Sequence, residues 1–422
     1  VIGRPFSHPF ADYPAGMSRT VFTGAKVFDG TGADPYPADV VIERERIVAI
    51  GPAGSSDADA AVDVGGKTLL PGLFDTHTHV VVSTADLWQI AQKPFSLQFF
   101  EAARNLRATL AAGITTVRDA GGADLGVKEA VASGVVPGPR VQISLVMLSQ
   151  TGGHGDDWLP SGDLIHFFQP HRGLPEAIVD GPDEMRRKVR ELHRMGAEVV
   201  KVATSGGVLS TRDDPRQAHF RPAELDVLVE EATAAGMFVM AHAQGAEGIK
   251  NAVRAGIRSI EHGVYLDDEG IELMLDRGTW LVPTLVAPQG VVDAIEAGAS
   301  LPPAVEEKAR AAVGTHRAAI SRAVEAGVRI AMGTDSGITA HGQNLRELEL
   351  MVAGGMTPAS ALEATTRTAA ELKGLDADLG TIEPGKLADL DGLAGDPYDF
   401  ASYRERVEAV WKAGERVVGD EG

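Results

Sequence analysis

The chain has 422 residues, of which 44% are hydrophobic, so it is long enough for one large domain and a smaller one. Its 39 basic and 59 acidic side chains give a formal net charge of −20, which makes nucleic acid and anionic membranes poor partners. It contains no cysteine, which excludes disulfides, thiolate metal sites and a cysteine nucleophile.

The first part of the chain predicts an extension followed by short antiparallel strands. Residues 1–16 are rich in proline and lack a continuous apolar run, so they do not resemble a signal peptide, and Met17 is a candidate natural start. Short apolar runs follow from 17 to 70, separated by glycine, aspartate and proline, as is typical of antiparallel strands. We expect a cytoplasmic protein, with a removed signal peptide as the alternative. No apolar run has the length of a membrane span.

The central part, residues 71–376, alternates strand-like segments with longer amphipathic ones. Helical patterns fill most of the gaps, and one runs from Pro303 to Ala326 with one apolar face that includes His316. Strand–helix alternation repeated eight times predicts an α/β fold with a (β/α)8 TIM barrel. The stretch from Leu148 to Pro182 is expected to form a loop over the barrel mouth. The predicted strands are Gly72–Val80, Thr115–Ala120, Arg140–Met147, Val199–Thr204, Phe238–His242, Ser259–His262, Trp280–Leu285 and Arg329–Thr334.

The last part, residues 377–422, returns to short strand-like runs such as Ala409–Ala413, with turn signals at Gly380 and at Pro384 and Gly385. We predict that it joins residues 17–70 in a small composite β-sandwich domain, which leaves 71–376 as the catalytic barrel.

Four histidines and one aspartate fall at the ends of predicted strands. His77 and His79 share one face of the first strand, because side chains at positions i and i+2 point the same way. With 12 histidines in the chain, such a pair alone is weak. His242, His262 and Asp335 close the fifth, sixth and eighth strands, and the strand ends of a barrel converge on its active face. A lone histidine is more often structural, but five candidate ligands that converge predict a metal site.

Lys201 lies inside the fourth predicted strand. One interpretation is a lysine that reaches the barrel rim and keeps its ammonium in solvent. An ammonium is a poor metal ligand, but a lysine that has added carbon dioxide is a carbamate anion able to bridge two cations. The residues alone leave both interpretations open.

These motifs resemble those of the amidohydrolase superfamily, and the resemblance extends over nearly the whole chain. It implies two divalent metal ions, with zinc as the expected metal because nitrogen and oxygen ligands suit it. It also implies that Asp335 acts as general base and then as general acid. The segments that carry the resemblance are Pro71–His79, Lys201, Ser259–Gly263, Gly333–Asp335 and Gly380–Leu390. The implied ligands are His77, His79 and Asp335 for the more buried ion, His242 and His262 for the second ion, and carboxylated Lys201 as the bridge.

Three further segments resemble one branch, the ochratoxinases and related prolidase-like carboxypeptidases. They are Thr151–Asp156, Lys201–Val208 and His242–Gly245. Members of this branch cleave an amide that joins an acyl group to a C-terminal amino acid. The resemblance implies that His154 donates a hydrogen bond to the developing oxyanion, and the alternative is a loop histidine without a role.

The substrate-binding residues are harder to assign. His219, His341 and Arg212 are candidates for contact with substrate, and structural roles are the alternative for the two histidines. Arg118 and Asp119 end the second predicted strand, where a structural ion pair is as good an interpretation as a functional one.

The favoured substrate is a small-molecule amide or peptide, for which ochratoxin A, an amide of phenylalanine, is the example that the resemblance suggests. The runner-up is an Xaa-Pro or Xaa-Arg/Lys dipeptidase. A cyclic-amide hydrolase fits less well, and a deaminase would not require Lys201. A non-catalytic assembly module of the same fold would have lost metal ligands, whereas this chain keeps all six. We also expect a homo-oligomer.

Overall fold

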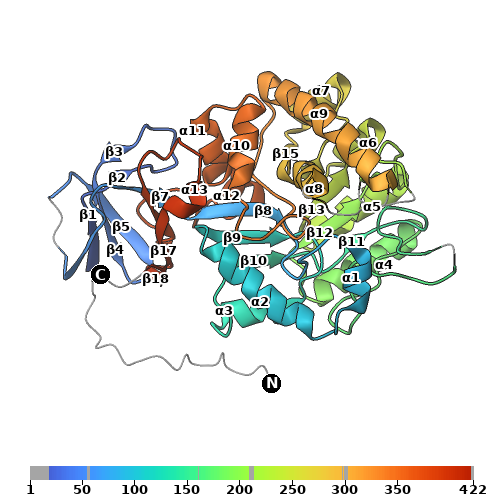
Figure 1. Ribbon diagram of the computed structural model, residues 1–422, viewed down its shortest axis with the longest axis horizontal. Coiled ribbons are helices and arrows are strands. Elements are labelled where there is room, and N and C mark those ends of the chain that lie inside the picture. Colours follow the sequence, from blue (N-terminus) through green and yellow to red (C-terminus); the bar gives the residue numbers. More distant parts are fainter. Residues whose placement is uncertain are drawn as a thin grey trace.

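The computed structural model describes residues 19–54, 58–159, 161–208, 213–296, 298 and 303–419. Parallel strands covered by helices form one part of the molecule, and sheets built largely from strands near the two chain ends form the other (Figure 1). The candidate site belongs to the first part, and the second part holds the strand that leads into it.

The smaller part contains a four-stranded sheet, ordered β5-β4-β1-β6, and a six-stranded sheet, ordered β18-β17-β16-β7-β2-β3. The two sheets share an apolar core in which the rings of Phe22 and Trp411 meet edge to face, 5.0 Å apart. Strands from both parts of the sequence therefore lie in one sheet, while the sandwich packing and the domain boundaries stay predictions. The elements are β1 Arg19–Thr23, β2 Lys26–Val27, β3 Tyr36–Pro37, β4 Asp39–Glu43, β5 Arg46–Gly51, β6 Ala60–Asp63, β7 Lys67–Pro71, β16 Leu390–Ala394, α13 Tyr403–Arg406, β17 Val407–Lys412 and β18 Glu415–Val418.

The larger part contains two parallel sheets, ordered β10-β9-β8 and β11-β12-β13-β14-β15. Each of the first seven predicted strands overlaps a strand of the structure, and the α/β class is confirmed. The strands are β8 Leu73–Thr78, β9 Ile114–Asp119, β10 Arg140–Ile143, β11 Met147–Leu148, β12 Val199–Ala203, β13 Phe238–Ala243, β14 Ser259–His262 and β15 Trp280–Val282.

Two predicted strands need correction. The third, predicted over 140–147, is broken between β10 and β11, because Leu145 adopts a φ of +70° that a strand cannot contain. The eighth, predicted over 329–334, is not a regular strand. Its backbone bonds to Leu281 of β15 on one side and to Thr76 of β8 on the other. It then becomes irregular, because Asp335 has a φ of +60°.

Helices follow most of these strands, and α9 has the bounds predicted from its apolar face. His316 on that face is buried. Several helices end at glycines with positive φ, such as Gly256 after α6 and Gly278 after α7, where a side chain would strain the backbone. The helices are α1 Leu87–Gln92, α2 Leu97–Leu110, α3 Leu125–Ala132, α4 Pro182–Arg194, α5 Pro222–Ala234, α6 Ala246–Ala255, α7 Asp268–Arg277, α8 Val286–Glu296, α9 Pro303–Ala326, α10 Arg346–Ala353, α11 Pro358–Ala364 and α12 Arg367–Lys373.

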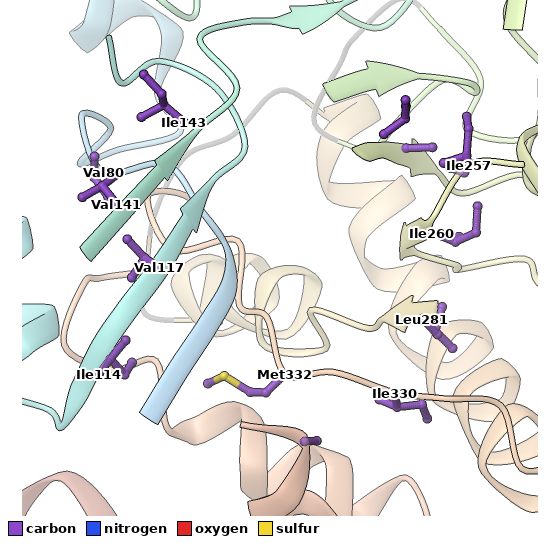
Figure 2. Close-up of a cluster of buried hydrophobic side chains, with 14 of the residues drawn as sticks. Val80, Ile114, Val117, Val141, Ile143, Ile257, Ile260, Leu281, Ile330 and Met332 are labelled. Atoms are coloured by element: carbon purple, nitrogen blue, oxygen red, sulfur yellow. The ribbon is translucent and has the colours of Figure 1, made fainter. Parts of the chain in front are cut away.

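The main apolar core lies among the parallel strands and their helices. Figure 2 shows Ile114 and Val117 of β9 in this cluster, with Ile260 of β14 and Leu281 of β15 on the facing side. Met332, in the irregular eighth segment, lies between them (Figure 2). Removal of this apolar surface from water is the main force that holds the strand ends in place.

Only Gly72 separates β7 of the smaller part from β8, which carries the first candidate ligand. The Gly72 N–H donates to the carbonyl of Asp389 across 2.8 Å, and a Cβ at this position would overlap the side chain of Thr115. The close approach therefore requires glycine, and it joins the two parts directly at the base of the site.

Candidate metal centre

Five of the candidate ligands lie at or near the C-terminal ends of strand segments, and Lys201 lies inside a strand. His77 belongs to β8, Lys201 to β12, His242 to β13 and His262 to β14. In the register of the sheet, Ala203 pairs with His242 and Ala243 pairs with His262, so neighbouring strands present their histidines at one edge. His77 and Lys201 are each only 1% exposed.

Donor atoms of His77, His262 and Asp335 all lie within 4.8 Å of one another. Oδ1 of Asp335 lies 3.5 Å from Nε2 of His77 and 3.2 Å from Nε2 of His79. Nζ of Lys201 lies 3.4 Å from Nε2 of His77. The structure therefore brings these five residues into one buried group.

His242 joins the group through ring contacts. Its ring centroid lies 4.7 Å from that of His262, which in turn lies 5.1 Å from that of His77. Nε2 of His242 lies 3.1 Å from the carbonyl oxygen of Gly206. All six candidate ligands thus form one continuous cluster at the strand ends.

Hydrogen bonds determine which nitrogen of each histidine faces the cluster. Nδ1 of His79 donates to the carbonyl of Gly121 across 2.8 Å. Nδ1 of His262 lies 2.7 Å from Oγ1 of Thr284, which donates its own hydrogen to a carbonyl and therefore accepts from the ring. Each Nε2 is left to offer a lone pair to the cluster.

His77 is fixed in the same way by a buried carboxylate. Its Nδ1 donates to Oε2 of Glu261 across 2.7 Å, and the other oxygen, Oε1, accepts from Arg118 and from Ser259. The carboxylate of Glu261 thus accepts from the guanidinium at one oxygen and from the His77 ring at the other. Sequence analysis did not single out Glu261, although it lies next to a candidate ligand.

The electrostatics of the cluster suit a cation. Burial, followed by the charge of Lys201, holds the pKa of His77 well below its usual value, and burial lowers the pKa values of His242 and His262. Burial opposes ionisation of Asp335, but the charges of His77, His79 and Lys201 outweigh it and lower the pKa of that carboxyl. Burial also opposes protonation of His79, but Asp335 outweighs it and raises the pKa of His79.

A simple chemical test supports a metal at this place. Oδ1 of Asp335 is buried and has no hydrogen-bond partner among the described residues, although it faces Nε2 of His77. A carboxylate oxygen and an imidazole lone pair repel each other unless a positive centre lies between them. The residues present therefore fit a divalent cation held by nitrogen and oxygen donors.

Lys201 is a buried amine. Burial lowers its pKa to about 8, so a larger fraction is neutral near physiological pH than for an exposed lysine. The neutral amine is the form that reacts with carbon dioxide.

His154 lies in the segment after β11 and contacts the cluster through His242. The two rings are stacked, with centroids 4.2 Å apart and planes at 16°. Nδ1 of His154 lies 2.8 Å from Oδ2 of Asp213, a residue that sequence analysis did not consider. No motif marks Asp213, because its role depends on the contact between two separate loops.

The remaining candidates have different surroundings. His219 is buried, and burial lowers the pKa of its ring. Its backbone N–H donates to the carbonyl of Thr204. Nε2 of His341 donates to the carbonyl of Val82, and burial lowers the pKa of His341 to about 4. Arg212 lies outside the described residues.

A segment between β11 and α4 contributes aromatic rings beside the cluster. Phe168 lies 5.5 Å from the ring of His79 between centroids, and Phe167 lies 6.3 Å from it.

Among the described residues, no helix combines the length and the apolar character required to cross a membrane.

Known proteins resemble this chain along most of its length. An ochratoxinase from Aspergillus niger is 38% identical over 428 residues, which cover 95% of this chain and 87% of the relative. The crystal structure of an Xaa-Pro dipeptidase with bound methionine has a TM-score of 0.86 at 33% identity and covers 96% of this chain and 100% of that one. A prolidase solved with N-methylphosphonate-L-proline has a TM-score of 0.87 at 36% identity, with the same coverage.

The sequence profile of the Amidohydrolase family matches residues 68–417. This range contains the six candidate ligands and His154. Enzymes of this family hydrolyse small-molecule or peptide substrates and generally use metal ions. The chain therefore belongs to the Amidohydrolase family and is a hydrolytic enzyme.

Proposed function

We propose that this enzyme hydrolyses the amide bond between an acyl group and a C-terminal amino acid, with two divalent metal ions, expected to be Zn²⁺. The observation that carries the proposal is the continuous cluster of His77, His79, Lys201, His242, His262 and Asp335, with His154 stacked on it. A purely structural role would leave Oδ1 of Asp335 buried without a hydrogen-bond partner among the described residues.

In this proposal His77, His79 and Asp335 would hold the more buried ion, His242 and His262 would hold the second, and carboxylated Lys201 would bridge the two. When bound, such ions lower the pKa of water and polarise the scissile carbonyl. The closed (β/α)8 barrel, the β-sandwich, the boundaries at 70/71 and 376/377, and the homo-oligomer belong to the same proposal.

The chain's own groups move the proton. Asp335 accepts a proton from the attacking water as the new C–O bond forms, and it passes that proton to the amide nitrogen as the C–N bond breaks. His154 donates a hydrogen bond to the oxygen that gains charge in between. The products are a carboxylic acid and an amino acid.

The substrate class follows from the relatives. Ochratoxinase similarity favours an aromatic acyl group on phenylalanine, as in the conversion of ochratoxin A to ochratoxin alpha and L-phenylalanine. Similarity to an Xaa-Pro dipeptidase and a prolidase favours dipeptides as the second candidate.

The test is a substrate panel on purified, metal-loaded enzyme. N-acyl phenylalanines, including ochratoxin A, and Xaa-Pro dipeptides are incubated separately, and the released amino acid is quantified. We expect release from at least one N-acyl phenylalanine and loss of that release after chelation. Hydrolysis of Xaa-Pro substrates alone would select the second candidate. No release from any compound, by enzyme with a full metal centre, would reject the proposal.

A further inference from the structure

A buried carboxylate, that of Asp213, contacts one ring nitrogen of His154. Oδ2 of Asp213 accepts from Nδ1 of His154 across 2.8 Å and from the backbone N–H of Gly207 across 3.0 Å. The Asp213 side chain is only 3% exposed, and that of His154 is 14% exposed. The carboxylate therefore holds the ring of His154 in an environment that is largely shielded from solvent.

A lysine from a distant helix holds this carboxylate and its loop. Nζ of Lys308, on α9, lies 3.6 Å from Oδ1 of Asp213 and donates to the Asp213 carbonyl across 2.5 Å. It also donates to the carbonyl of Gly207 across 3.2 Å. Lys308 thus places a positive charge beside the Asp213 carboxylate and, through the carbonyls of Gly207 and Asp213, connects the two chain segments on either side of it.

The ring of His154 is confined on its faces as well. One face stacks on His242, 4.2 Å away between centroids. Gly207 lies so close to the ring that a Cβ there would overlap it. The imidazole therefore occupies a slot formed by a candidate metal ligand, a glycine and a carboxylate.

We propose that Asp213 is a positioning residue for hydrolysis: supported by Lys308, it fixes the orientation of His154. An ionised carboxylate only accepts hydrogen bonds, so Nδ1–H of His154 is committed to Asp213 and Nε2 is the nitrogen that remains for substrate. To donate from Nε2 to the developing oxyanion as well, the ring must carry a hydrogen on both nitrogens. This inference rests on the catalytic role of His154 in the proposed function. It adds two residues, Asp213 and Lys308, that act through His154 and not on substrate.

A double-mutant cycle tests the inference. His154→Ala, Asp213→Asn and the double variant are compared with wild type for kcat, KM, metal content and thermal unfolding. Loss of a partner that orients an active-site histidine typically costs about 10- to 100-fold, so we expect Asp213→Asn to lower kcat by that factor with metal content unchanged. Because Asp213 acts through His154, the double variant should be no slower than His154→Ala alone.

Two further variants separate positioning from general damage. Asp214→Asn changes the neighbouring carboxylate, which pairs with Arg216 in a partly exposed position, and it should retain wild-type kcat. Lys308→Met keeps Asp213 but removes its cation, and it should lower kcat in wild type but not in the His154→Ala background. This second cycle keeps the inference testable if Asp213→Asn does not fold.

The outcomes distinguish the two proposals. If His154→Ala keeps wild-type kcat, the role of His154 in the proposed function is wrong. If His154→Ala is slow but Asp213→Asn and Lys308→Met are not, only the positioning inference is overturned. Additive losses in both cycles would also overturn it, because they would show that the two residues act independently of His154.

Discussion

Nδ1 of His77 lies 2.7 Å from Oε2 of Glu261, although the two residues are 184 positions apart in the chain. The same carboxylate accepts from Arg118 across 2.9 Å, and both charged side chains are almost fully buried. This relationship determines that Nε2 of His77 faces Asp335, so the affinity of the site for metal depends on a residue that is not itself a ligand.

We expect Glu261→Gln to weaken metal binding by about 10- to 100-fold, because the amide has no charge to fix the ring or to balance Arg118. Competition with a chelator of known affinity measures the change. Glu408→Gln is the control, because Glu408 is half exposed and forms an ion pair with Lys67 in the smaller part, with 3.2 Å between Nζ and Oε2. Equal metal affinity in Glu261→Gln and wild type would show that the carboxylate does not tune the ligand.

Asp335→Asn should leave metal bound and abolish turnover. Asparagine retains an oxygen ligand but cannot accept the proton from water, and such proton transfer contributes about 10²- to 10⁴-fold. Elemental analysis and a hydrolysis assay on the same sample measure the two properties. Near-normal kcat would remove Asp335 from the acid–base role.

Lys201→Ala should reduce the metal content of the enzyme, because it removes the group proposed to bridge the two ions. Metal per chain is measured after dialysis against a fixed free concentration. Lys250→Ala is the control, because Lys250 on α6 is also largely buried but pairs with Glu247, 2.7 Å away, outside the cluster. Full occupancy in Lys201→Ala would reject the bridge.

Gly207→Ala should displace His154 without removing any ligand. The added Cβ would overlap the imidazole, and a misplacement of this kind can cost about 100-fold in rate. We expect lower kcat at unchanged metal content. Gly314→Ala, on α9 in open space, is the matched control and should be as active as wild type. Wild-type kcat in Gly207→Ala would mean that the ring position does not matter.

Protonation of His316 should contribute to acid destabilisation. Burial lowers its pKa to about 4 from the ordinary 6.5, and its Nε2 donates to the carbonyl of His262 across 2.7 Å. Between pH 6.5 and 4 the unfolded chain binds a proton that the folded chain does not, so stability is present above this window and is lost as pH falls through it. From pH 7 to 5 the loss is about 2 kcal/mol in the free energy of unfolding.

Chemical denaturation at pH 7 and pH 5 measures this contribution. His316→Gln retains a donor but does not titrate, so it should lose less stability than wild type over the same interval. His193→Gln replaces an exposed histidine and should behave like wild type. Parallel pH dependence in wild type and His316→Gln would contradict the assignment.

The sequence allowed the candidate ligands to be predicted because each is a metal-binding residue type near the end of a recognisable strand. The partners of these ligands could not be predicted in the same way. Arg118 and Asp119 look like an ion pair in sequence, but adjacent residues of a strand point to opposite faces. Arg118 pairs with Glu261, whereas Asp119 accepts from the backbone N–H groups of Val80, Gly121 and Ala123.

The same limit applies to the fold. The apolar pattern of residues 329–334 predicts a strand. The positive φ of Asp335 cannot be predicted from an aspartate that follows a strand-like segment. The contact of Asp213 with His154 joins two loops 59 residues apart, and nothing in either loop indicates that they meet.

The join at Gly72 also bears on how the chain is made. β7 runs directly into the strand of His77, yet one of its two neighbours in the sheet, β16, is distant in sequence: Oγ1 of Thr68 donates to the carbonyl of Gly395, 327 positions later. During synthesis, β7 can therefore pair with β2 early but pairs with β16 only after nearly all described residues have been made. Translation arrest or a frameshift ahead of β16 would leave β7 with one neighbour instead of two, even though every candidate ligand had already been incorporated.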